Sequence, residues 1–249
     1  MTSRGWALVT GAGRRIGAAL AVAAAEAGYD VIVHHRASGD EARATARRIE
    51  TIGRRAVLAT GDLADPDACR RLIDEAPGVV TLLVNSASLF EKDAAHSFDV
   101  ARYEAAMAVN LRAPILLAQA MANALPEGGT GLIVNVTDQR VWRLTPKYFS
   151  YTLSKAALWT ATQTLAQAFA PRIRVNAIGP GPTLASIHQS DESFAAQAAA
   201  VPMARGPATH EIAAALIYLI DAPSVTGQMI AVDGGQHLSW RTPDVIVDD

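Results

Sequence analysis

Tyr151 and Lys155 are the two residues whose types and spacing are best suited to chemistry. Residues four positions apart share one face of a helix, and the pattern predicts a helix from here to about Ala170. A phenol has an ordinary pKa of about 10, and a nearby ammonium lowers that pKa by stabilising the phenolate. The pair would then act as a proton donor. Because any helix can carry Tyr-x-x-x-Lys by chance, the alternative is a core phenol beside a surface lysine, and a nucleotide site is needed to decide.

A glycine-rich turn near the start of the chain supplies such a site. The motif Thr10-Gly11-x-Gly13-x-x-x-Gly17 follows a short apolar run, and a helical pattern begins at Ile16. Small residues at a strand-to-helix turn let the backbone approach a pyrophosphate, which then meets the free N–H groups of the helix N-terminus. The sequence therefore predicts a dinucleotide site, with a tight turn that binds no ligand as the alternative.

Basic residues around this turn favour NADPH over NADH. An NAD-selective site usually has a carboxylate about 20 residues further on, at the end of the second strand. Here that place reads His34-His35-Arg36, and Arg14 and Arg15 lie in the loop itself. A guanidinium donates paired hydrogen bonds to a phosphate, so these residues suit the extra phosphate of NADPH. The alternative is a solvated basic rim. The histidines lack the company of other metal-ligand residues, so no metal is predicted.

Strand patterns alternate with helical patterns along the 249 residues, half of which are apolar. Nearly continuous apolar runs predict strands at 5–10, 31–33, 56–58, 79–84, 131–136, 174–178 and 229–232. Helical patterns occupy 16–27, 41–52, 66–75, 100–124, 151–170 and 211–220, with Pro114 expected to kink or restart the fourth. This alternation predicts an α/β fold: a single Rossmann-type doubly wound parallel sheet of about seven strands with helices on both faces. With no linker or repeat, residues 1–249 are expected to form one domain.

Composition narrows the class of protein. The formal net charge is -2, which indicates neither a nucleic-acid surface nor a strongly acidic partner. No apolar stretch is expected to reach the roughly 20 residues that a membrane span needs. The first strand begins near Trp6, which leaves no room for a signal peptide, and the single cysteine, Cys69, cannot form an internal disulfide. A cytoplasmic protein that binds neither nucleic acid nor membrane is expected.

Taken together, the motifs resemble the short-chain dehydrogenase/reductase family. In the family's order the chain carries the glycine turn, Asp62-Leu63, Asn85-Ser86-Ala87, Asn110, Tyr151-x-x-x-Lys155, Pro180-Gly181 and Asp233-Gly234-Gly235. The resemblance implies that Asp62 contacts the adenine and Asn85 the adenosine side. It implies that Lys155 holds the nicotinamide ribose and that Asn110 anchors a water that reprotonates it. The implied cofactor-binding residues are Gly11, Arg14, Arg15, Ile16, Gly17, His35, Arg36, Asp62, Leu63, Asn85, Ser86, Ala87, Tyr151, Lys155, Pro180 and Gly181.

Two departures from the family pattern point to one branch. The family usually has a serine thirteen residues before the tyrosine, and Asp138 stands there in this chain. The usual Asn-Asn-Ala-Gly is replaced by Asn85-Ser86-Ala87-Ser88. Together with the basic turn, these features are similar to the pteridine reductases and the bacterial dihydromonapterin or dihydrofolate reductases. In that branch an aromatic residue matching Phe90 stacks on the pterin, and an arginine matching Arg15 reaches cofactor phosphate and substrate.

A carboxyl group at position 138 suits a pterin better than a ketone. A ketone needs a hydrogen-bond donor on its oxygen, whereas a pterin presents C=N bonds and a 2-amino group. A carboxyl group can donate or accept according to its protonation state. The alternatives are that Asp138 is a turn residue, with Thr137 supplying a hydroxyl, and that Phe90 is an apolar residue at a loop base. The predicted catalytic residues are Tyr151, Lys155, Asp138 and Asn110, and the predicted substrate-binding residues are Arg15, Ser88, Phe90, Asp138 and Tyr151.

These residues predict an NADPH-dependent reductase that passes a hydride to a C=N bond of a dihydropterin-type substrate. One alternative is an NADPH-dependent carbonyl reductase acting on a ketone or sugar. Another is a nucleotide-binding sensor or scaffold without turnover. The stretch 183–205 follows the sixth strand at the carboxyl edge of the sheet and is expected to form a lid over the substrate.

The resemblance also implies a homo-tetramer formed through the helices after the fourth and fifth strands. Alanine-rich faces at 105–120 and 156–168 would allow close helix packing there. His188 and Trp142 lie in loops at the expected pocket rim, but their position alone gives them no role. The tail 241–249 could reach a neighbouring subunit or fray, and the sequence does not decide between the two.

Overall fold

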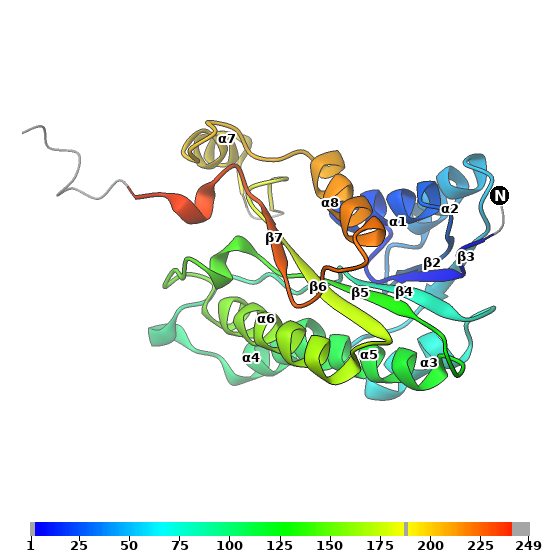
Figure 1. The fold of residues 1–249 in the computed structure, drawn as a ribbon. Coiled ribbons are helices and arrows are strands. Elements are labelled where there is room, and N and C mark those ends of the chain that lie inside the picture. Colours follow the sequence, from blue (N-terminus) through cyan, green and yellow to red (C-terminus); the bar gives the residue numbers. More distant parts are fainter. Residues whose placement is uncertain (1–2, 187–188, 241–249) are drawn as a thin grey trace, which may run out of the picture.

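The computed structural model describes residues 3–186 and 189–240, so His188 and the tail 241–249 lie outside the described residues. Seven parallel strands form one sheet in the order β3-β2-β1-β4-β5-β6-β7 (Figure 1). Their bounds are β1 Trp6–Val9, β2 Asp30–His35, β3 Ala56–Thr60, β4 Val80–Asn85, β5 Gly131–Val136, β6 Ile173–Pro180 and β7 Met229–Val232. The predicted sheet is confirmed.

Helices cover both faces of this sheet (Figure 1). One face carries α1 Arg15–Glu26, α2 Gly39–Thr51 and α8 Thr209–Asp221, and the other carries α3 Pro66–Asp74, α4 Val100–Met107, α5 Ala113–Ala124 and α6 Phe149–Phe169. Helix α7, Asp191–Ala199, follows β6 and stands apart from both layers within the predicted lid. Short helical turns complete the described chain: η1 Ala95–Ser97, η2 Ala108–Arg112, η3 Gln139–Val141 and η4 Gln236–Leu238.

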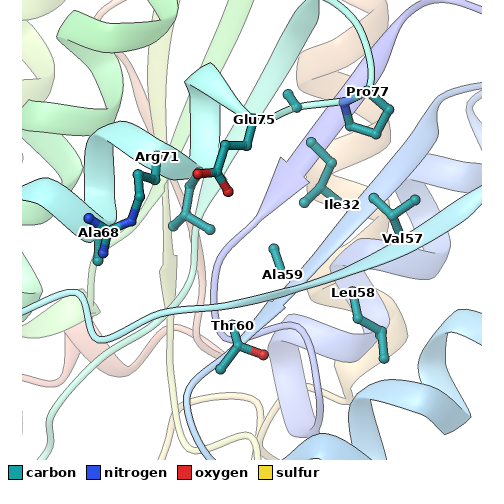
Figure 2. A pocket seen from close by; sticks show the side chains of 11 residues that line it. Ile32, Val57, Leu58, Ala59, Thr60, Ala68, Arg71, Glu75 and Pro77 are labelled. Carbon is teal, nitrogen blue, oxygen red and sulfur yellow. The ribbon is translucent and has the colours of Figure 1, made fainter.

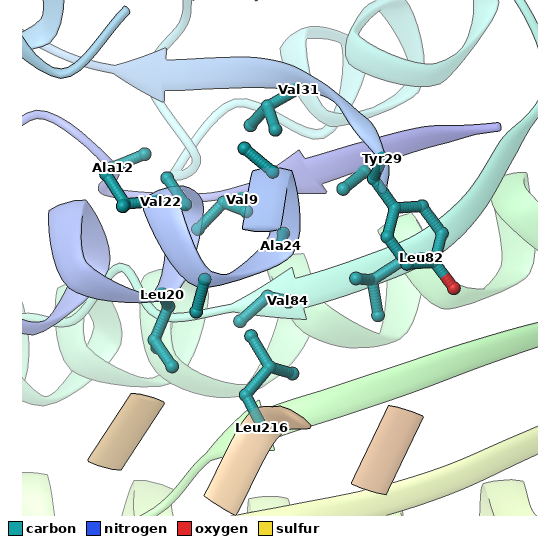
Figure 3. Close-up of a cluster of buried hydrophobic side chains, with 14 of the residues drawn as sticks. Val9, Ala12, Leu20, Val22, Ala24, Tyr29, Val31, Leu82, Val84 and Leu216 are labelled. Carbon is teal, nitrogen blue, oxygen red and sulfur yellow. The ribbon is translucent and has the colours of Figure 1, made fainter. Parts of the chain in front are cut away.

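Two apolar clusters, one on each face, hold the helices against the sheet. On the first face Leu20 of α1 and Leu216 of α8 pack with Val84 of β4 (Figure 3). On the second, Leu117 of α5 packs with Leu83, the next residue along the same strand. Burial of one such side chain stabilises the fold by roughly 1.5–3 kcal/mol. Because consecutive strand residues face opposite clusters, the strands read as continuous apolar runs rather than as alternating patterns.

The helical region from Val100 to Ala124 is the one described stretch long and apolar enough to cross a membrane, with 25 residues and a mean hydropathy of 1.3. The prediction that no apolar stretch approaches this length is therefore wrong. Half of its most apolar window is buried inside the protein, where α5 packs against α3. The π-helical turn η2 separates α4 from α5, and Pro114 lies in the first turn of α5. The expected restart at Pro114 is therefore present.

The order of the strands reverses between β1 and β4. The chain winds from β1 through β2 to β3 on one side, then crosses to β4 and continues outward on the other. In open sheets of this kind, ligands bind outside the carboxyl ends of the strands at such a reversal. Thr10, Asn85 and Thr137 stand at the carboxyl ends of β1, β4 and β5. The fold therefore gathers the predicted motifs at one edge.

Candidate active site

The glycine turn after β1 has no space for larger residues. A Cβ on Gly11 would lie 2.9 Å from the Cα of Ala87, and Gly11 has a φ of 65°. A Cβ on Gly17 would lie 2.2 Å from the carbonyl oxygen of Gly11. The Oγ1 of Thr10 accepts hydrogen bonds from the backbone N–H groups of Ser86 (3.0 Å) and Ala87 (3.1 Å). The turn is thus fixed against the end of β4, with bare backbone where a pyrophosphate would approach.

Helix α1 begins directly after this turn, and its N-cap residue, Arg14, makes no side-chain capping bond. The first N–H groups of a helix have no intrahelical partner, so this end suits an anion. Arg15 has a left-handed φ of 57°, and its guanidinium donates to the carbonyls of Ala185 (2.8 Å) and Leu184 (3.2 Å). Burial and the neighbouring charge of Arg14 lower the pKa of the Arg15 guanidinium. Arg15 therefore joins the turn to the beginning of the predicted lid.

The end of β2 places two histidines, His34 and His35, near the turn. The Nδ1 of His34 accepts from the N–H of Gly11 at 3.2 Å, and its Nε2 donates to the carbonyl of Gly61 at 3.1 Å. Burial lowers the pKa of His34 to about 4, so the ring is neutral. His35 is buried, with Nε2 3.2 Å from the hydroxyl of Thr60 and Nδ1 without a partner. Because that nitrogen is closed off from the surface, the predicted cofactor contact of His35 stays a prediction.

Arg36 and Asp62 form the outer rim of this region. Their side chains are both exposed, and Arg36 Nη1 lies 3.9 Å from Asp62 Oδ2. Leu63 is buried behind them. The predicted phosphate and adenine contacts are therefore neighbours, although their roles stay predictions.

The predicted acid–base residues meet at the start of α6. Tyr151 and Lys155 lie on the same buried face of the helix. The Tyr151 hydroxyl donates to Oδ2 of Asp138 at 2.9 Å. The Nζ of Lys155 donates to the carbonyl of Val136 at 2.7 Å and lies 5.8 Å from the centre of the Tyr151 ring. The structure thus brings together three of the four predicted catalytic side chains.

The electrostatics of this group differ from the expectation. Burial and the Asp138 charge raise the pKa of Tyr151 well above its ordinary value. Burial lowers the pKa of Lys155 to about 8, and the Asp138 charge opposes that effect. The expected lowering of the phenol pKa by the ammonium is wrong for this arrangement. The carboxylate touches the hydroxyl, whereas the ammonium is held on a carbonyl. The phenol stays protonated, which is the form that donates a proton.

Arg140 was missed by the sequence reasoning. Its backbone N–H donates to Oδ1 of Asp138 at 2.8 Å, and its Nη1 lies 3.4 Å from Oδ2. The guanidinium carbon lies 5.5 Å from the ring centre of Phe90 and 5.2 Å from that of Tyr148. These two rings stack on each other at 4.3 Å, and Phe90 meets Tyr151 edge to face at 4.7 Å. The predicted aromatic residue is therefore part of the active-site wall.

Asn110, the fourth predicted catalytic residue, lies in η2 and is fully buried. Its Oδ1 accepts from the N–H of Leu89 (2.8 Å) and the hydroxyl of Ser88 (3.2 Å). Its Nδ2 donates to the carbonyl of Leu89 (2.9 Å) and the hydroxyl of Ser154 (3.0 Å). The carboxamide thus fastens the loop after β4 to α6. The predicted water-anchoring role stays a prediction.

Asn85 is also buried, and its Nδ2 donates to Oδ1 of Asn135 at 2.8 Å. Its own Oδ1 has no partner.

Thr137 is turned away from the site, because its hydroxyl donates to the carbonyl of Ile178 at 3.0 Å and contacts the sulfur of Met229. Thr137 therefore offers no hydroxyl in the place of the missing serine.

A pocket of about 170 Å³ opens beside this group. Its lining residues are Arg15, Ile16, Phe90, Asp138, Gln139, Arg140, Tyr148, Pro180, Gly181, Pro182, Thr183, Leu184, Ser186, Gln189, Phe194, Gln197 and Gln236. Residues of the predicted cofactor site, substrate site and lid thus surround one space. A larger pocket of about 280 Å³ lies between β3 and α3, lined by Leu58, Thr60 and Arg71 among others (Figure 2). None of the predicted site residues lines that second pocket.

Two further features of the site gave no readable signal in the sequence. Tyr148 has a left-handed φ of 57°, which a sequence pattern does not indicate for an aromatic residue. The carboxylate of Asp93 accepts from the hydroxyl (2.5 Å) and the N–H of Ser150, so it caps α6 from a distant loop. For Arg140, by contrast, the sequence carries one local signal: an Asp-x-Arg pattern directly after a strand, which places a cation two residues from Asp138.

Comparison with known proteins places this site in a family. A family model described as enoyl-(acyl carrier protein) reductase matches residues 11–237. Relatives more than 30% identical over most of the chain are described as sugar or sugar-alcohol dehydrogenases. The chain belongs to the short-chain dehydrogenase/reductase family, as the motifs predicted, and it is an oxidoreductase.

Particular relatives narrow the likeness. The structure of FolM alternative dihydrofolate reductase 1 from Brucella suis in complex with NADP is 48% identical, with a TM-score of 0.94 over 98% of this chain and 100% of that one. Its counterpart from Brucella canis, also with NADP, is 48% identical with a TM-score of 0.94 over 98% of each chain. Among curated proteins, glucose 1-dehydrogenase of Gluconobacter oxydans is 33% identical over 93% of this chain and 91% of its own.

Proposed function

We propose that this chain is an NADP(H)-dependent reductase that transfers a hydride to a C=N bond of a dihydropterin-type substrate. The cofactor predicted from Arg14, Arg15 and Arg36 is borne out by the NADP in the two Brucella structures. The dihydrofolate reductase name of those proteins supports a pterin substrate. The scaffold alternative is set aside because the chain is an oxidoreductase.

The observation that carries the proposal is the direct bond from the Tyr151 hydroxyl to the Asp138 carboxylate, at 2.9 Å. A ketone reductase needs a hydroxyl donor at this position, and Thr137 is committed to Ile178 and Met229 instead. A carboxylate can accept N–H groups of a pterin, which a serine does less well. The chemistry at position 138 therefore favours a nitrogen heterocycle.

In this proposal the bound cofactor supplies the hydride, and the chain's own residues bind the substrate and move the proton. Tyr151, which burial keeps protonated, delivers a proton to the ring nitrogen. Asp138 orients the hydroxyl and accepts from substrate N–H groups. Phe90 lines the pocket and packs against the substrate ring. Arg15 lines the pocket and positions the ring, whereas the Ser88 hydroxyl donates to Asn110 and its contact with substrate stays a prediction.

The test is NADPH oxidation with 7,8-dihydrobiopterin or dihydromonapterin, beside NADH and a panel of ketones and sugars. We expect turnover with the pterin and NADPH, reduced on the order of 100-fold or more in Asp138→Ala. Asp138→Ser is the discriminating variant, because it restores the donor that carbonyl reductases use. Pterin turnover should be lost in it.

The second candidate function is carbonyl reduction of a sugar, favoured by the glucose 1-dehydrogenase relative. Ketone or sugar turnover without pterin turnover would establish it. Asp138→Ser would then retain or gain activity, and Asp138 would be a local structural residue.

At the level of the whole chain we propose one domain over 1–249, with 183–205 as the substrate lid. Arg15 already donates hydrogen bonds to the first part of this segment, at the carbonyls of Leu184 and Ala185.

We further propose a cytoplasmic homo-tetramer that pairs through α5 and α6, where Ile115 and Leu153 are exposed. A monomer mass in light scattering would refute the tetramer.

A further inference from the structure

Arg140 stands where the acid–base pair meets the aromatic wall. Its backbone N–H holds one oxygen of Asp138 at 2.8 Å, and its guanidinium lies 3.4 Å from the other. That second oxygen is the one that accepts the Tyr151 hydroxyl. The carboxylate therefore has donors on both oxygens, and two of the three come from Arg140.

The ion pair is unlike most others in this protein. The side chains of Arg140 and Asp138 are each only 15% exposed, whereas those of Arg36 and Asp62 are 62% and 50% exposed. An exposed pair is worth little, whereas removal of one partner from a pair shielded from water leaves an uncompensated charge, which is costly. The Arg140 guanidinium thus lies inside the site, against the Asp138 carboxylate, and not on the exposed surface.

The same guanidinium contacts the aromatic wall. It lies 5.5 Å from the centre of Phe90 and 5.2 Å from that of Tyr148, within the range of cation–π attraction. Phe90 in turn meets Tyr151 edge to face. One cation therefore touches both the carboxylate and the stacked rings that line the pocket.

We infer that Arg140 is a positioning residue: it holds Asp138 on the Tyr151 hydroxyl and holds the Phe90–Tyr148 stack in register with them. This inference rests on the proposed role of Asp138 in the reaction. Other charged groups around the carboxylate are Lys155 on α6, which lies on the same buried face as Tyr151, and Arg15 on α1, which lines the same pocket. Arg140 differs from both because it contacts the carboxylate directly.

The test is a double-mutant cycle on kcat and KM. Arg140→Gln should lower kcat on the order of 10- to 100-fold through misplacement of Asp138, with KM for NADPH within about twofold of wild type. Arg140→Lys keeps the charge and should recover part of kcat. In an Asp138→Asn background, Arg140→Gln should have little further effect, because the group it acts through is already altered.

The matched control is Arg143→Gln, which removes the same charge from an exposed residue three positions away that does not line the pocket. Circular dichroism and NADPH fluorescence check that each variant folds and binds cofactor. If Arg140→Gln does not fold, Arg140→Lys takes its place. Its kcat is then compared with that of Arg143→Gln, in the wild-type protein and in the Asp138→Asn variant, to test the inference. Equal kcat in wild type and folded Arg140 variants, or full additivity with Asp138→Asn, would overturn the inference.

Failure of the proposed function gives a different result. In that case wild type does not oxidise NADPH with a dihydropterin, and the same cycle is run on the ketone or sugar that it does reduce. Where Asp138→Asn lowers kcat on that substrate, a role of Arg140 through Asp138 would show as non-additivity; where Asp138→Asn and Arg140→Gln both leave kcat unchanged, the inference is overturned together with the proposed function. Additive losses on that substrate would refute it.

Discussion

Lys155 carries the buried ammonium of the site, and its ionisation should control how cofactor capture depends on pH. Burial lowers its pKa to about 8, while the pKa of Tyr151 is raised well above the ordinary value. The ammonium is charged below pH 8 and loses its proton above it, whereas the phenol does not titrate in this range. We expect kcat/KM for NADPH, which reports the free enzyme, to fall with an apparent pKa of about 8.

The measurement is a set of initial rates between pH 6 and 10 at subsaturating NADPH. Lys155→Arg supplies the comparison, because a guanidinium stays charged over this range and should remove the alkaline fall. An alkaline fall at the same pH in Lys155→Arg would assign it to another group.

Sequence reasoning at the residue scale succeeded where the relation is local. Tyr151 and Lys155 share a helical face by their spacing, and Asp138 precedes the tyrosine by a countable interval. Arg140 and Tyr148 were missed because their roles depend on how a loop folds back. No local pattern shows that a guanidinium two residues after Asp138 turns onto Phe90, fifty residues earlier in the chain.

Helix α6 carries Tyr151 and Lys155, and its N-terminus is capped by Asp93, which lies in a distant loop. Asp93 is buried, and its carboxylate accepts from the N–H and hydroxyl of Ser150. Asp93→Ala should lower the free energy of unfolding by about 2 kcal/mol, because it removes the cap and leaves buried donors unpaired. The loss should appear as a lower midpoint in urea unfolding with an unchanged slope.

Asp99→Ala is the control for this prediction. Asp99 caps α4 through the N–H of Arg102 at 2.9 Å, but it is exposed. Water can replace its bond, so its removal should cost less than about 1 kcal/mol. Equal losses in the two variants would mean that burial of the Asp93 contacts adds nothing.

At the element scale, the strand and helix patterns predicted the sheet because its five inner strands, β2, β1, β4, β5 and β6, are buried on both faces. The interruption before Pro114 was also foreseen, since proline at a first helical turn is a local signal. The cap on α6 was not, because Asp93 is 57 residues away from Ser150 in the chain. The short helix α7 fell within the predicted lid, but its position depends on contacts that no periodicity records.

For the whole molecule, one edge of the sheet collects residues from almost the entire chain. The turn after β1 touches the end of β4 through Thr10 and Ala87, and Arg15 at the start of α1 bonds the segment after β6. A ligand that spans these parts would stabilise the folded state as a unit. The size of that effect depends on how well each nicotinamide cofactor fits the basic residues near β2.

NADPH should therefore raise the melting temperature of the protein more than NADH at the same concentration. A ligand at 100 times its Kd stabilises the folded state by about 2.7 kcal/mol. In a domain of 150–250 residues each kcal/mol corresponds to roughly 2–4 °C, so a rise of roughly 5–10 °C is expected for NADPH. Differential scanning fluorimetry over a concentration series measures both cofactors.

The double variant Arg14→Ala/Arg36→Ala should narrow the gap between the two cofactors, because it removes two of the cations predicted to meet the extra phosphate of NADPH. Arg47→Ala/Arg48→Ala is the matched control, since it removes the same charge from α2, away from the glycine turn. Equal stabilisation of the wild-type protein by NADH and NADPH would contradict the cofactor preference read from the basic turn. A gap that survives the double variant would assign the preference for NADPH to other residues, and Arg15, the first residue of α1, would be tested next.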